Sequence, residues 1–284
     1  MDEITQLPVL APRRADSNKG DFGRVLVVAG SRGMSGAAVL CGSAALRGGA
    51  GLVRVAVPEG IWNVVAAGNP CLMTAPLPQD AAGRLSLAAE PELAKLAQAN
   101  DVLAIGPGLS RSADLDTLLA RQLSQLTVPV VLDADGLNAF AGQPEALKKH
   151  GGPLIVTPHP GEFARLIGSD AKSVQAKRRE LASRFAADYG IIVVLKGHGT
   201  IVTDGRRMYQ NTTGNPGMAT GGTGDVLTGV IAALVGQGLE PFAAAQLGVH
   251  VHGLAGDLAR EDKGEVSLIA TDLVDYLPRV FRKI

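Results

Sequence analysis

The chain of 284 residues is 46% hydrophobic and 19% charged, which is the composition of a globular protein without long disordered tracts. Lysine plus arginine number 27, as do aspartate plus glutamate, so the formal net charge is zero. This balance argues against a nucleic-acid or membrane-surface partner held by bulk charge. The sequence has neither a basic leader before an apolar run nor an apolar stretch long enough to span a membrane, and we expect a cytoplasmic protein.

Glycine is unusually frequent. There are 36 glycines among the 284 residues, or about 13% against a usual figure of about 7%. Without a collagen period, this excess indicates backbone that approaches a ligand or packs closely against other elements. The two cysteines, Cys41 and Cys71, have the spacing of neither a zinc site nor a disulfide framework, and we expect two buried thiols.

Short apolar runs alternate with helix-length segments along the chain. The runs predict strands, several followed by a turn, at residues 24–30, 52–57, 101–108, 129–136, 153–162 and 191–197. Helical spacing or end signals predict helices at residues 35–49, 92–99, 114–123, 146–152 and 174–190, and from about Asp225 onward. Residues 200–211 predict a hairpin around Asp204 and Gly205.

Alternating strands and helices are typical of a parallel sheet covered on both faces. No linker divides the chain, so we predict one α/β domain over residues 1–284, with residues 1–18 as an N-terminal extension. Ligands of open α/β sheets bind beyond the carboxyl ends of the strands. The most unusual residues follow the predicted strands there: residues 30–31, 106–108, 133–135, 157–160 and 196–197.

The strongest functional motif is the glycine-rich segment at residues 221–224, directly before an apolar helix. Free N–H groups and the positive end of the helix dipole would meet there, so Gly222, Thr223 and Gly224 predict an anion hole. Asp225 lies at its edge. We predict that Asp225 is a general base for a hydroxyl that attacks phosphorus, and a helix cap is the structural alternative.

A second glycine turn follows a predicted strand at residues 196–200. Gly197 and Gly199 permit a turn against a nucleotide, and Lys196 can neutralise phosphate charge. The alternative is a hairpin loop with a solvated lysine, which the residues alone favour.

His159 and Glu162 lie in the segment Thr-Pro-His-Pro-Gly-Glu, residues 157–162. Two prolines stiffen the backbone around His159 and hold its imidazole in one direction, either toward a substrate or at the surface. Glu162 opens the following helix, where we expect it to complement the helix dipole rather than to hold magnesium through water.

Further polar residues follow the predicted strands. Asp133, Asp135 and Asn138 predict an Asx-type turn, with contact to substrate or metal-bound water as the alternative. His250 and His252 are two residues apart on a predicted helix and point to different faces, so they predict packing or capping residues rather than a metal pair.

Small residues at two element ends leave room for a ring. Gly108 follows a strand where glycine lets a ligand touch the backbone, and we assign it to substrate. Ala37 and Ala38 open the first long helix, where small side chains would admit a ring or allow tight packing against the sheet. The residues do not choose between these two alternatives.

The Gly-Thr-Gly-Asp segment of residues 222–225 resembles the G-x-G-D turn that opens a helix in the ribokinase-like superfamily. The chain also contains, in this order, the segments GDFGRVLVVAGSRGMSGAAVL, GPGL, TPHPGEFARL, VVLKGHGT and GNPGMATGGTGDVLTG. Each is weak alone, but the ordered set is similar to the NAD(P)H-hydrate dehydratase family of carbohydrate-kinase-like repair enzymes. The similarity runs from about Lys19 to the last helix.

This resemblance implies a carbon–oxygen lyase acting on the S epimer of NADH or NADPH hydrated at C6 of the reduced ring (NADHX, NADPHX). A nucleotide would phosphorylate the C6 hydroxyl with the help of Mg²⁺, and phosphate would then leave to restore the double bond. The nucleotide is ADP, converted to AMP, in bacterial-type members and ATP in eukaryotic ones. The implied base is Asp225. The implied substrate contacts are Ala37 or Ala38, Gly108, His159 and Asp225, and the implied nucleotide contacts are Lys196, Gly197, His198, Gly199, Thr200 and Gly224.

The resemblance also suggests a homotetramer that cooperates with a separate NAD(P)HX epimerase. Because only some eighteen residues precede the first of these motifs, we expect no epimerase domain like that of bifunctional members. The alternative enzyme is a kinase of the same fold acting on a thiazole or hydroxymethylpyrimidine alcohol. A nucleotide sensor without turnover is a further alternative, but a protein that only binds phosphate has no use for the Asp225 carboxylate. The glycine spacing after the first predicted strand does not match the dinucleotide-binding motif, which excludes a dehydrogenase of that kind.

Overall fold

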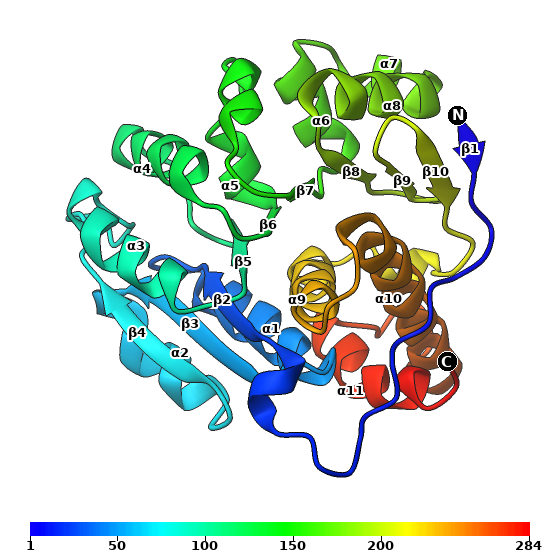
Figure 1. The fold of residues 1–284 in the computed structure, drawn as a ribbon, viewed down its shortest axis with the longest axis horizontal. Helices are drawn as coiled ribbons and strands as arrows, with labels where there is room; N and C mark the ends of the chain where they lie inside the picture. The colour runs from blue at the N-terminus through cyan, green and yellow to red at the C-terminus, as the bar shows by residue number, and fades with distance from the viewer.

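A ten-stranded sheet runs through the molecule, and the computed structural model describes all residues from 1 to 284 (Figure 1). Its strands are β1 (Asp2–Glu3), β2 (Arg24–Val28), β3 (Leu52–Pro58), β4 (Met73–Leu77), β5 (Val102–Ile105), β6 (Val130–Leu132), β7 (Leu154–Val156), β8 (Ile192–Leu195), β9 (Ile201–Thr203) and β10 (Arg207–Gln210). They lie in the order β1-β10-β9-β8-β7-β6-β5-β2-β3-β4. From β8 to β4 all neighbours are parallel, whereas β9 is antiparallel to both β8 and β10.

Helices connect the strands and follow them. The α-helices are α1 (Ser35–Arg47), α2 (Trp62–Gly68), α3 (Glu90–Gln98), α4 (Ala113–Gln125), α5 (Ala134–Asn138), α6 (Pro160–Ile167), α7 (Ala171–Ala176), α8 (Arg178–Tyr189), α9 (Thr223–Gly236), α10 (Pro241–Lys263) and α11 (Ala270–Phe281). Short 3-10 helices are η1 (Lys19–Phe22), η2 (Glu59–Ile61), η3 (Leu87–Ala89), η4 (Pro144–Lys149) and η5 (Pro216–Met218).

Local sequence signals set several helix ends. Ser112 and Asp170 begin α4 and α7 by accepting hydrogen bonds from backbone N–H groups of the first turn. Gly168 and Gly190 end α6 and α8 in the left-handed conformation, each with a φ of 65°, which glycine adopts without a steric penalty.

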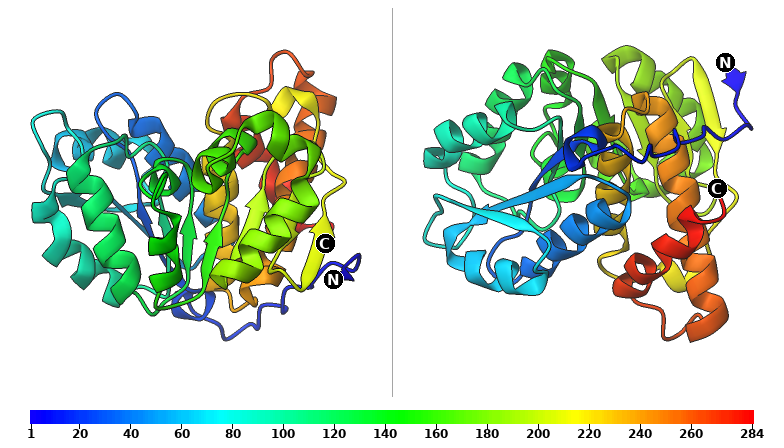
Figure 2. Two further views of the ribbon diagram at one scale, coloured as in Figure 1. Left: turned by 90° about the horizontal axis from the view of Figure 1, so that it is seen from above. Right: turned by 60° about the horizontal axis from the view of Figure 1, so that its bottom comes forward.

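The strands divide the interior into two hydrophobic layers. Val25 and Val27 of β2 face the layer formed with α1, α2, α9, α10 and α11. Leu26 and Val28 face the other layer, formed with α3 to α8. Side chains alternate between the faces of a strand, so a strand buried on both faces reads as a continuous apolar run. Figure 2 shows helices on both sides of the sheet.

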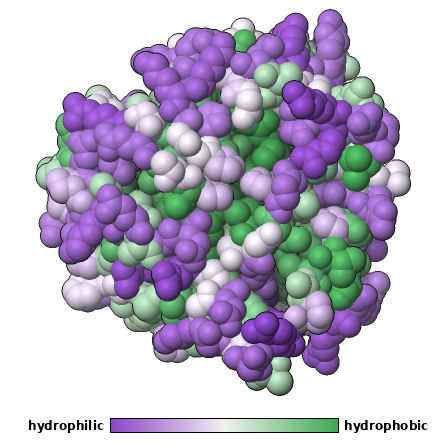
Figure 3. Space-filling view, in the orientation of Figure 1, coloured by the Kyte–Doolittle hydropathy of each residue, from purple (hydrophilic) through white to green (hydrophobic).

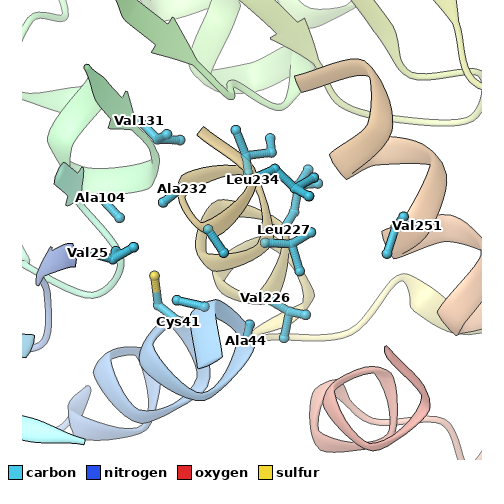
Figure 4. Close-up of a cluster of buried hydrophobic side chains, with 14 of the residues drawn as sticks. Val25, Cys41, Ala44, Ala104, Val131, Val226, Leu227, Ala232, Leu234 and Val251 are labelled. Carbon is cyan, nitrogen blue, oxygen red and sulfur yellow. The ribbon is translucent and has the colours of Figure 1, made fainter. Parts of the chain in front are cut away.

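Helix α9 is the central buried element. Every residue from Val226 to Val235 is buried, and Figure 4 shows its side chains between the sheet, α1 and α10. The backbones of α9 and α1 come so close that a Cβ atom on Gly229 would lie 2.1 Å from the carbonyl oxygen of Cys41. This contact fixes the position of α9 and therefore of its N-terminal end, which carries the glycine-rich motif.

The predicted fold class is confirmed: a mostly parallel sheet is covered by helices on both faces. The strands predicted from the apolar runs correspond to β2, β3, β5, β6, β7 and β8, and the predicted hairpin corresponds to β9 and β10. The single helix predicted at residues 174–190 is wrong in detail, because Lys177 leaves the helical conformation and separates α7 from α8. Cys71 is exposed, which corrects the prediction of two buried thiols.

The N-terminal segment lies against the rest of the molecule. Asp2 and Glu3 pair with β10, and residues 7–13 line a cavity of about 580 Å³ together with residues of α10 and α11. Figure 3 shows hydrophobic residues gathered at the lower right of one face, where Figure 1 places α10 and this segment. None of the helices combines the length and the apolar character that crossing a bilayer requires.

The close packing of α9 on α1 is testable by substitution. We expect Gly229→Ala to lower the free energy of unfolding by about 1–3 kcal/mol, because the added methyl group must displace the backbone of α1. Gly36→Ala is the control, since a Cβ atom there meets nothing within 4 Å and alanine favours the helix. Urea unfolding of both variants measures the effect, and equal midpoints would contradict this account of the packing.

Candidate active site

The carboxyl ends of the parallel strands meet at one edge of the sheet, as predicted. Backbone hydrogen bonds hold the segments that follow them together: Gly30 N–H donates to Pro107 O at 2.8 Å, Asp133 N–H to Ile105 O at 3.0 Å, and Lys196 N–H to Pro158 O at 2.9 Å. The N-terminal end of α9 lies at the same edge, because a Cβ atom on Gly224 would be 3.4 Å from Lys196 Nζ and 3.7 Å from Asp133 Oδ2.

The first turn of α9 offers unpaired backbone donors. Gly222 precedes the helix with a φ of 92°, and the first intrahelical bond runs from Val226 N–H to Gly222 O at 3.2 Å. The N–H groups of Thr223, Gly224 and Asp225 find no acceptor in the protein. Unpaired N–H groups at the positive end of a helix dipole are suited to an anion, so the geometry matches an anion hole.

The Asp225 carboxyl group lies in this first turn without a hydrogen bond to the protein. No side chain caps α9, so the alternative that Asp225 is a helix cap receives no support. Burial, followed by the negative charge of Asp133, raises the pKa of Asp225 from its ordinary value of 3.8 to about 7, although Lys196 acts in the opposite direction. A carboxyl group with this pKa is suited to accept a proton near neutral pH.

Lys196 forms a buried ion pair with Asp133. Its Nζ atom lies 2.7 Å from Asp133 Oδ1, and the side chain of Asp133 is only 1% exposed. The second oxygen, Oδ2, accepts a hydrogen bond of 2.8 Å from the hydroxyl group of Thr228 on α9. The Asx-type turn predicted for Asp133 is therefore wrong, because its side chain makes no capping bond, and Lys196 is not a solvated lysine.

The charge of Lys196 is balanced from two sides. Glu162 Oε2 lies 3.9 Å from Lys196 Nζ and adds a second carboxylate to the pair with Asp133. Burial disfavours the charged amine, but Asp133 and Glu162 outweigh burial and raise the pKa of Lys196. The same surroundings raise the pKa of the buried Cys41 thiol, first through burial and then through Asp225 and Asp133. Lys196 is therefore a fixed positive charge beside Asp225 and Gly224.

His159 and Glu162 form a reciprocal cap at the start of α6. His159 Nδ1 accepts hydrogen bonds from the N–H groups of Gly161 at 3.0 Å and Glu162 at 3.3 Å, and Glu162 Oε2 accepts one from His159 N–H at 2.8 Å. This capping role agrees with the expectation that Glu162 serves the helix terminus. Because Nδ1 is an acceptor, a neutral His159 carries its proton on Nε2.

The structure distinguishes the two small residues of α1. Ala38 has no exposed surface and packs in the core, whereas Ala37 is half-buried. A Cβ atom on Gly108, whose φ is 63°, would lie 2.8 Å from Ala37 Cβ, so these two positions face each other. Ser31 Oγ donates a hydrogen bond of 2.8 Å to Gly108 O and holds this turn. Of the two alanines, only Ala37 is placed to meet a ligand beside Gly108.

Asp135 and Asn138 connect neighbouring loops instead of forming a local turn. Asp135 Oδ2 accepts a hydrogen bond of 2.7 Å from Ser110 N–H, and Oδ1 accepts one of 3.2 Å from Asn138 Nδ2. Arg165 donates from Nε and Nη2 to Asn138 Oδ1 at 3.1 and 3.0 Å. These hydrogen bonds link the loop after β5 to α5, and α5 to α6.

His252 supports the first turn of α9 from α10. Its Nε2 atom lies 2.8 Å from the carbonyl oxygen of Thr223. Burial lowers the pKa of His252 to about 4, so the neutral ring donates this hydrogen bond at pH 7. This contact agrees with the packing role expected from the sequence.

Arg178 supports the turn at residues 196–200, and sequence reasoning did not predict that this residue belongs to the site. Arg178, which the sequence places on the face of an amphipathic helix, donates hydrogen bonds to three backbone carbonyl groups at and around this turn. Thr228 was missed as well, although a polar residue within the apolar run of α9 was a usable signal. No sequence signal connects Arg178 to the turn, because the contact depends on the tertiary structure.

The residues at this edge fit a magnesium ion that is carried mainly by a nucleotide. The structure has no cluster of three or more histidine, cysteine, aspartate or glutamate side chains that could hold a metal ion. Magnesium commonly keeps several waters and binds one or two carboxylates together with substrate phosphates. Asp133 and Glu162 flank Lys196 and already have partners in the protein, so they would contact such an ion through its bound waters.

Comparison with known proteins assigns this arrangement to a family. A family model described as NAD(P)H-hydrate dehydratase matches residues 25–279. The chain belongs to the NAD(P)H-hydrate dehydratase family. A bifunctional NAD(P)H-hydrate repair enzyme from Moorella thermoacetica is 48% identical over 283 residues, which cover 99% of this chain and 52% of that protein. The chain thus spans about half the length of the curated relatives it matches.

Solved structures share the fold. The ADP/ATP-dependent NAD(P)H-hydrate dehydratase from Bacillus subtilis, co-crystallised with ATP and Mg²⁺, has a TM-score of 0.83 and 33% identity, with 96% of this chain and 94% of that chain covered. The hydroxyethylthiazole kinase from Pyrococcus horikoshii has a TM-score of 0.61 and 20% identity, with 92% and 91% covered, which shows a common fold alone. The ribokinase-like fold predicted from the G-x-G-D turn is confirmed.

The raised pKa of Asp225 predicts a pH-dependent cost in stability. The folded protein binds the Asp225 proton more tightly than the unfolded chain does. The free energy of unfolding is therefore unaffected by Asp225 below about pH 4, where the group is protonated in both states. It falls as the pH rises to about 7 and stays constant above that pH, where the group is ionised in both states. The difference in pKa corresponds to about 4 kcal/mol at most. We therefore expect Asp225→Asn to raise the urea midpoint at pH 8 but not at pH 4.

Asp275→Asn serves as the control, because Asp275 is exposed and has no ion-pair partner in the structure. A gain in stability for Asp225→Asn that is equal at both pH values would show that burial and Asp133 do not disfavour the Asp225 carboxylate.

Proposed function

We propose that this chain dehydrates the S epimer of hydrated NADH and NADPH back to NADH and NADPH, with conversion of ADP to AMP and phosphate. The observation that carries the proposal is the half-buried Asp225 carboxyl group, which has no hydrogen-bond partner in the protein and lies beside unpaired N–H groups of α9 and the charge of Lys196. A protein that only bound phosphate would gain nothing from a carboxylate at that point. Membership of the family supplies the substrate class.

The first step is transfer of a phosphoryl group to the C6 hydroxyl of the hydrated ring. Asp225 removes the hydroxyl proton as the oxygen attacks the terminal phosphorus of the nucleotide. A new P–O bond forms, the bond between that phosphorus and the oxygen of the next phosphate breaks, and AMP leaves when the donor is ADP. The N–H groups of the first turn of α9 stabilise the charge that develops on the phosphoryl oxygens.

The second step is loss of phosphate from C6. The C6–O bond breaks with both electrons on the phosphate oxygen, a proton passes from C5 to water, and the electron pair of the C5–H bond forms the double bond between C5 and C6. Hydroxide is a poor leaving group and phosphate is a much better one, which is why the hydroxyl is phosphorylated first. The anion hole serves both steps, because the charge stays on the phosphate throughout.

The nucleotide binds beside Lys196, Gly197, His198, Gly199, Thr200 and Gly224. Lys196 is placed to contact phosphate, because it lies beside Gly224 and the free N–H groups of α9. Mg²⁺, when bound, would neutralise phosphate charge, and Asp133 and Glu162 would hold it through its bound waters. We assign ADP as the donor, with ATP as a possible replacement, since the related Bacillus subtilis enzyme is described as dependent on ADP or ATP.

The substrate ring binds between Ala37, Gly108 and His159, with its C6 hydroxyl toward Asp225. Gly108 and Ala37 face each other, and the cap at the start of α6 holds the imidazole of His159 in place. We propose that residues 1–284 act as one catalytic domain and cooperate with an NAD(P)HX epimerase. The homotetramer and the cytoplasmic location expected from the sequence stay predictions.

A vitamin-precursor kinase is the weaker alternative. It would use the same base and anion hole but release a stable phosphate ester of a thiazole or pyrimidine alcohol. The hydroxyethylthiazole kinase shares only the fold with this chain, whereas the dehydratase family matches nearly its whole length.

Recovery of absorbance at the reduced-nicotinamide band tests the proposed reaction. We expect purified protein to restore this absorbance from hydrated NADPH only when both Mg²⁺ and ADP or ATP are present, because the hydroxyl must first be phosphorylated. Recovery without any phosphoryl donor would refute the mechanism. Phosphorylation of a thiazole or pyrimidine alcohol without action on hydrated NADPH would establish the kinase instead.

The role of Asp225 as base has its own test. We expect Asp225→Asn to lower kcat by about 10²–10⁴-fold with substrate and nucleotide affinities kept, because the amide has the same shape but cannot accept the proton. In the wild type, kcat/KM should rise with pH to a plateau above about pH 7, where the carboxylate is ionised. If the variant keeps more than about a tenth of the wild-type kcat, the base lies elsewhere, with Asp133 and Asp135 as the next candidates.

A further inference from the structure

Arg178 lies at the start of α8, below the turn at residues 196–200. Its Nη1 donates a hydrogen bond of 2.6 Å to His198 O, and its Nη2 donates to Leu195 O at 2.9 Å and to Lys196 O at 3.1 Å. One guanidinium group therefore binds three backbone carbonyl groups at and around the turn. The planar fork of arginine suits this arrangement, because several donors diverge from one rigid group.

These contacts determine which way the N–H groups of the turn point. In a trans peptide the C=O of one residue and the N–H of the next point in opposite directions, and the chain has no cis peptide bonds. Since Lys196 O and His198 O point toward Arg178, the N–H groups of Gly197 and Gly199 point away from it. Gly197 O accepts from Thr200 Oγ1 at 2.9 Å, so the N–H of His198 points away from the Thr200 hydroxyl group.

The donors exposed in this way are unpaired. The N–H groups of Gly197, His198 and Gly199 have no acceptor in the protein. The backbone has φ values of 132° at Gly197 and 63° at Gly199, both in the region that favours glycine. A Cβ atom on Gly197 would also lie 3.3 Å from Arg178 Nη2, so the guanidinium packs directly under the turn. Consecutive unpaired N–H groups of this kind form a concavity that binds anions.

We propose that Arg178 is a positioning residue for the nucleotide: by binding the carbonyl groups of Leu195, Lys196 and His198 it holds the N–H groups of the turn toward the nucleotide phosphates. The inference rests on the proposed function, because it assumes that a nucleotide binds at this turn. Arg178 itself lies behind the backbone and does not contact the nucleotide. It acts on nucleotide affinity and leaves the substrate ring and Asp225 untouched.

Calorimetric titration with ADP and steady-state kinetics test this role. Arg178→Met keeps the aliphatic stem but removes the donors, and we expect its Kd and KM for ADP to rise by about 10–100-fold. At saturating ADP its kcat should stay close to that of the wild type, and its KM for hydrated NADPH should not change. Arg178→Lys keeps the charge but cannot span three carbonyl groups, and we expect it to recover only part of the ADP affinity.

Arg184→Met is the matched control, because Arg184 lies on the same helix, is exposed and has no hydrogen-bond or ion-pair partner in the structure. It removes the same charge and should bind ADP as the wild type does. The inference is overturned if Arg178→Met keeps wild-type ADP affinity, or if it loses kcat and substrate affinity to the same extent as ADP affinity.

Full ADP affinity in Arg178→Lys would also overturn the inference, and this variant decides the matter if Arg178→Met does not fold. A wild-type protein that binds neither ADP nor ATP overturns the proposed function together with this inference. Unchanged ADP affinity in the Arg178 variants overturns this inference alone.

Discussion

The ion pair between Lys196 and Asp133 organises the site. It joins the end of β8 to the end of β6, and Thr228 joins it to α9 through the second carboxylate oxygen. A buried carboxylate is tolerated only when it is paired and hydrogen-bonded, and Asp133 satisfies both conditions. Asp225 does not, because its carboxyl group has no hydrogen bond and lies near the negative charge of Asp133. Of these two carboxylates, only Asp225 has no partner in the protein, and it is therefore the one available for proton transfer.

The packing of α9 determines where this unsatisfied carboxylate lies. The helix is buried from Val226 to Val235 and approaches α1 at Gly229 without room for a side chain. Its first turn therefore cannot move away from the strand ends, and His252 holds the Thr223 carbonyl group from the opposite side. Because the first turn of α9 is fixed in this way, the base and the anion hole are held close to the same reacting group. The hydrophobic core and the chemistry are connected through the same helix.

Sequence reasoning predicts the parts of this structure that depend on local pattern. The apolar runs predict the central strands, and the glycine-rich segment at residues 221–224 predicts the anion hole and the place of Asp225. It does not predict the ion pair of Lys196 with Asp133, because these residues are 63 positions apart and each has a plausible local role. The choice between Ala37 and Ala38 likewise needed the structure, since only packing shows which of them is buried.

The balance of charge at the site explains why the proposed reaction needs a cation from outside the chain. Lys196 is already opposed by Asp133 and Glu162, so the nearby side chains offer no surplus of positive charge to nucleotide phosphates. Lys196 stays paired with Asp133, because loss of this pair would leave a buried carboxylate without a partner, which is strongly unfavourable. A divalent cation bound together with the nucleotide would supply the positive charge that the phosphates need. The proposed dependence on Mg²⁺ therefore follows from the same ion pair that keeps Asp133 in place.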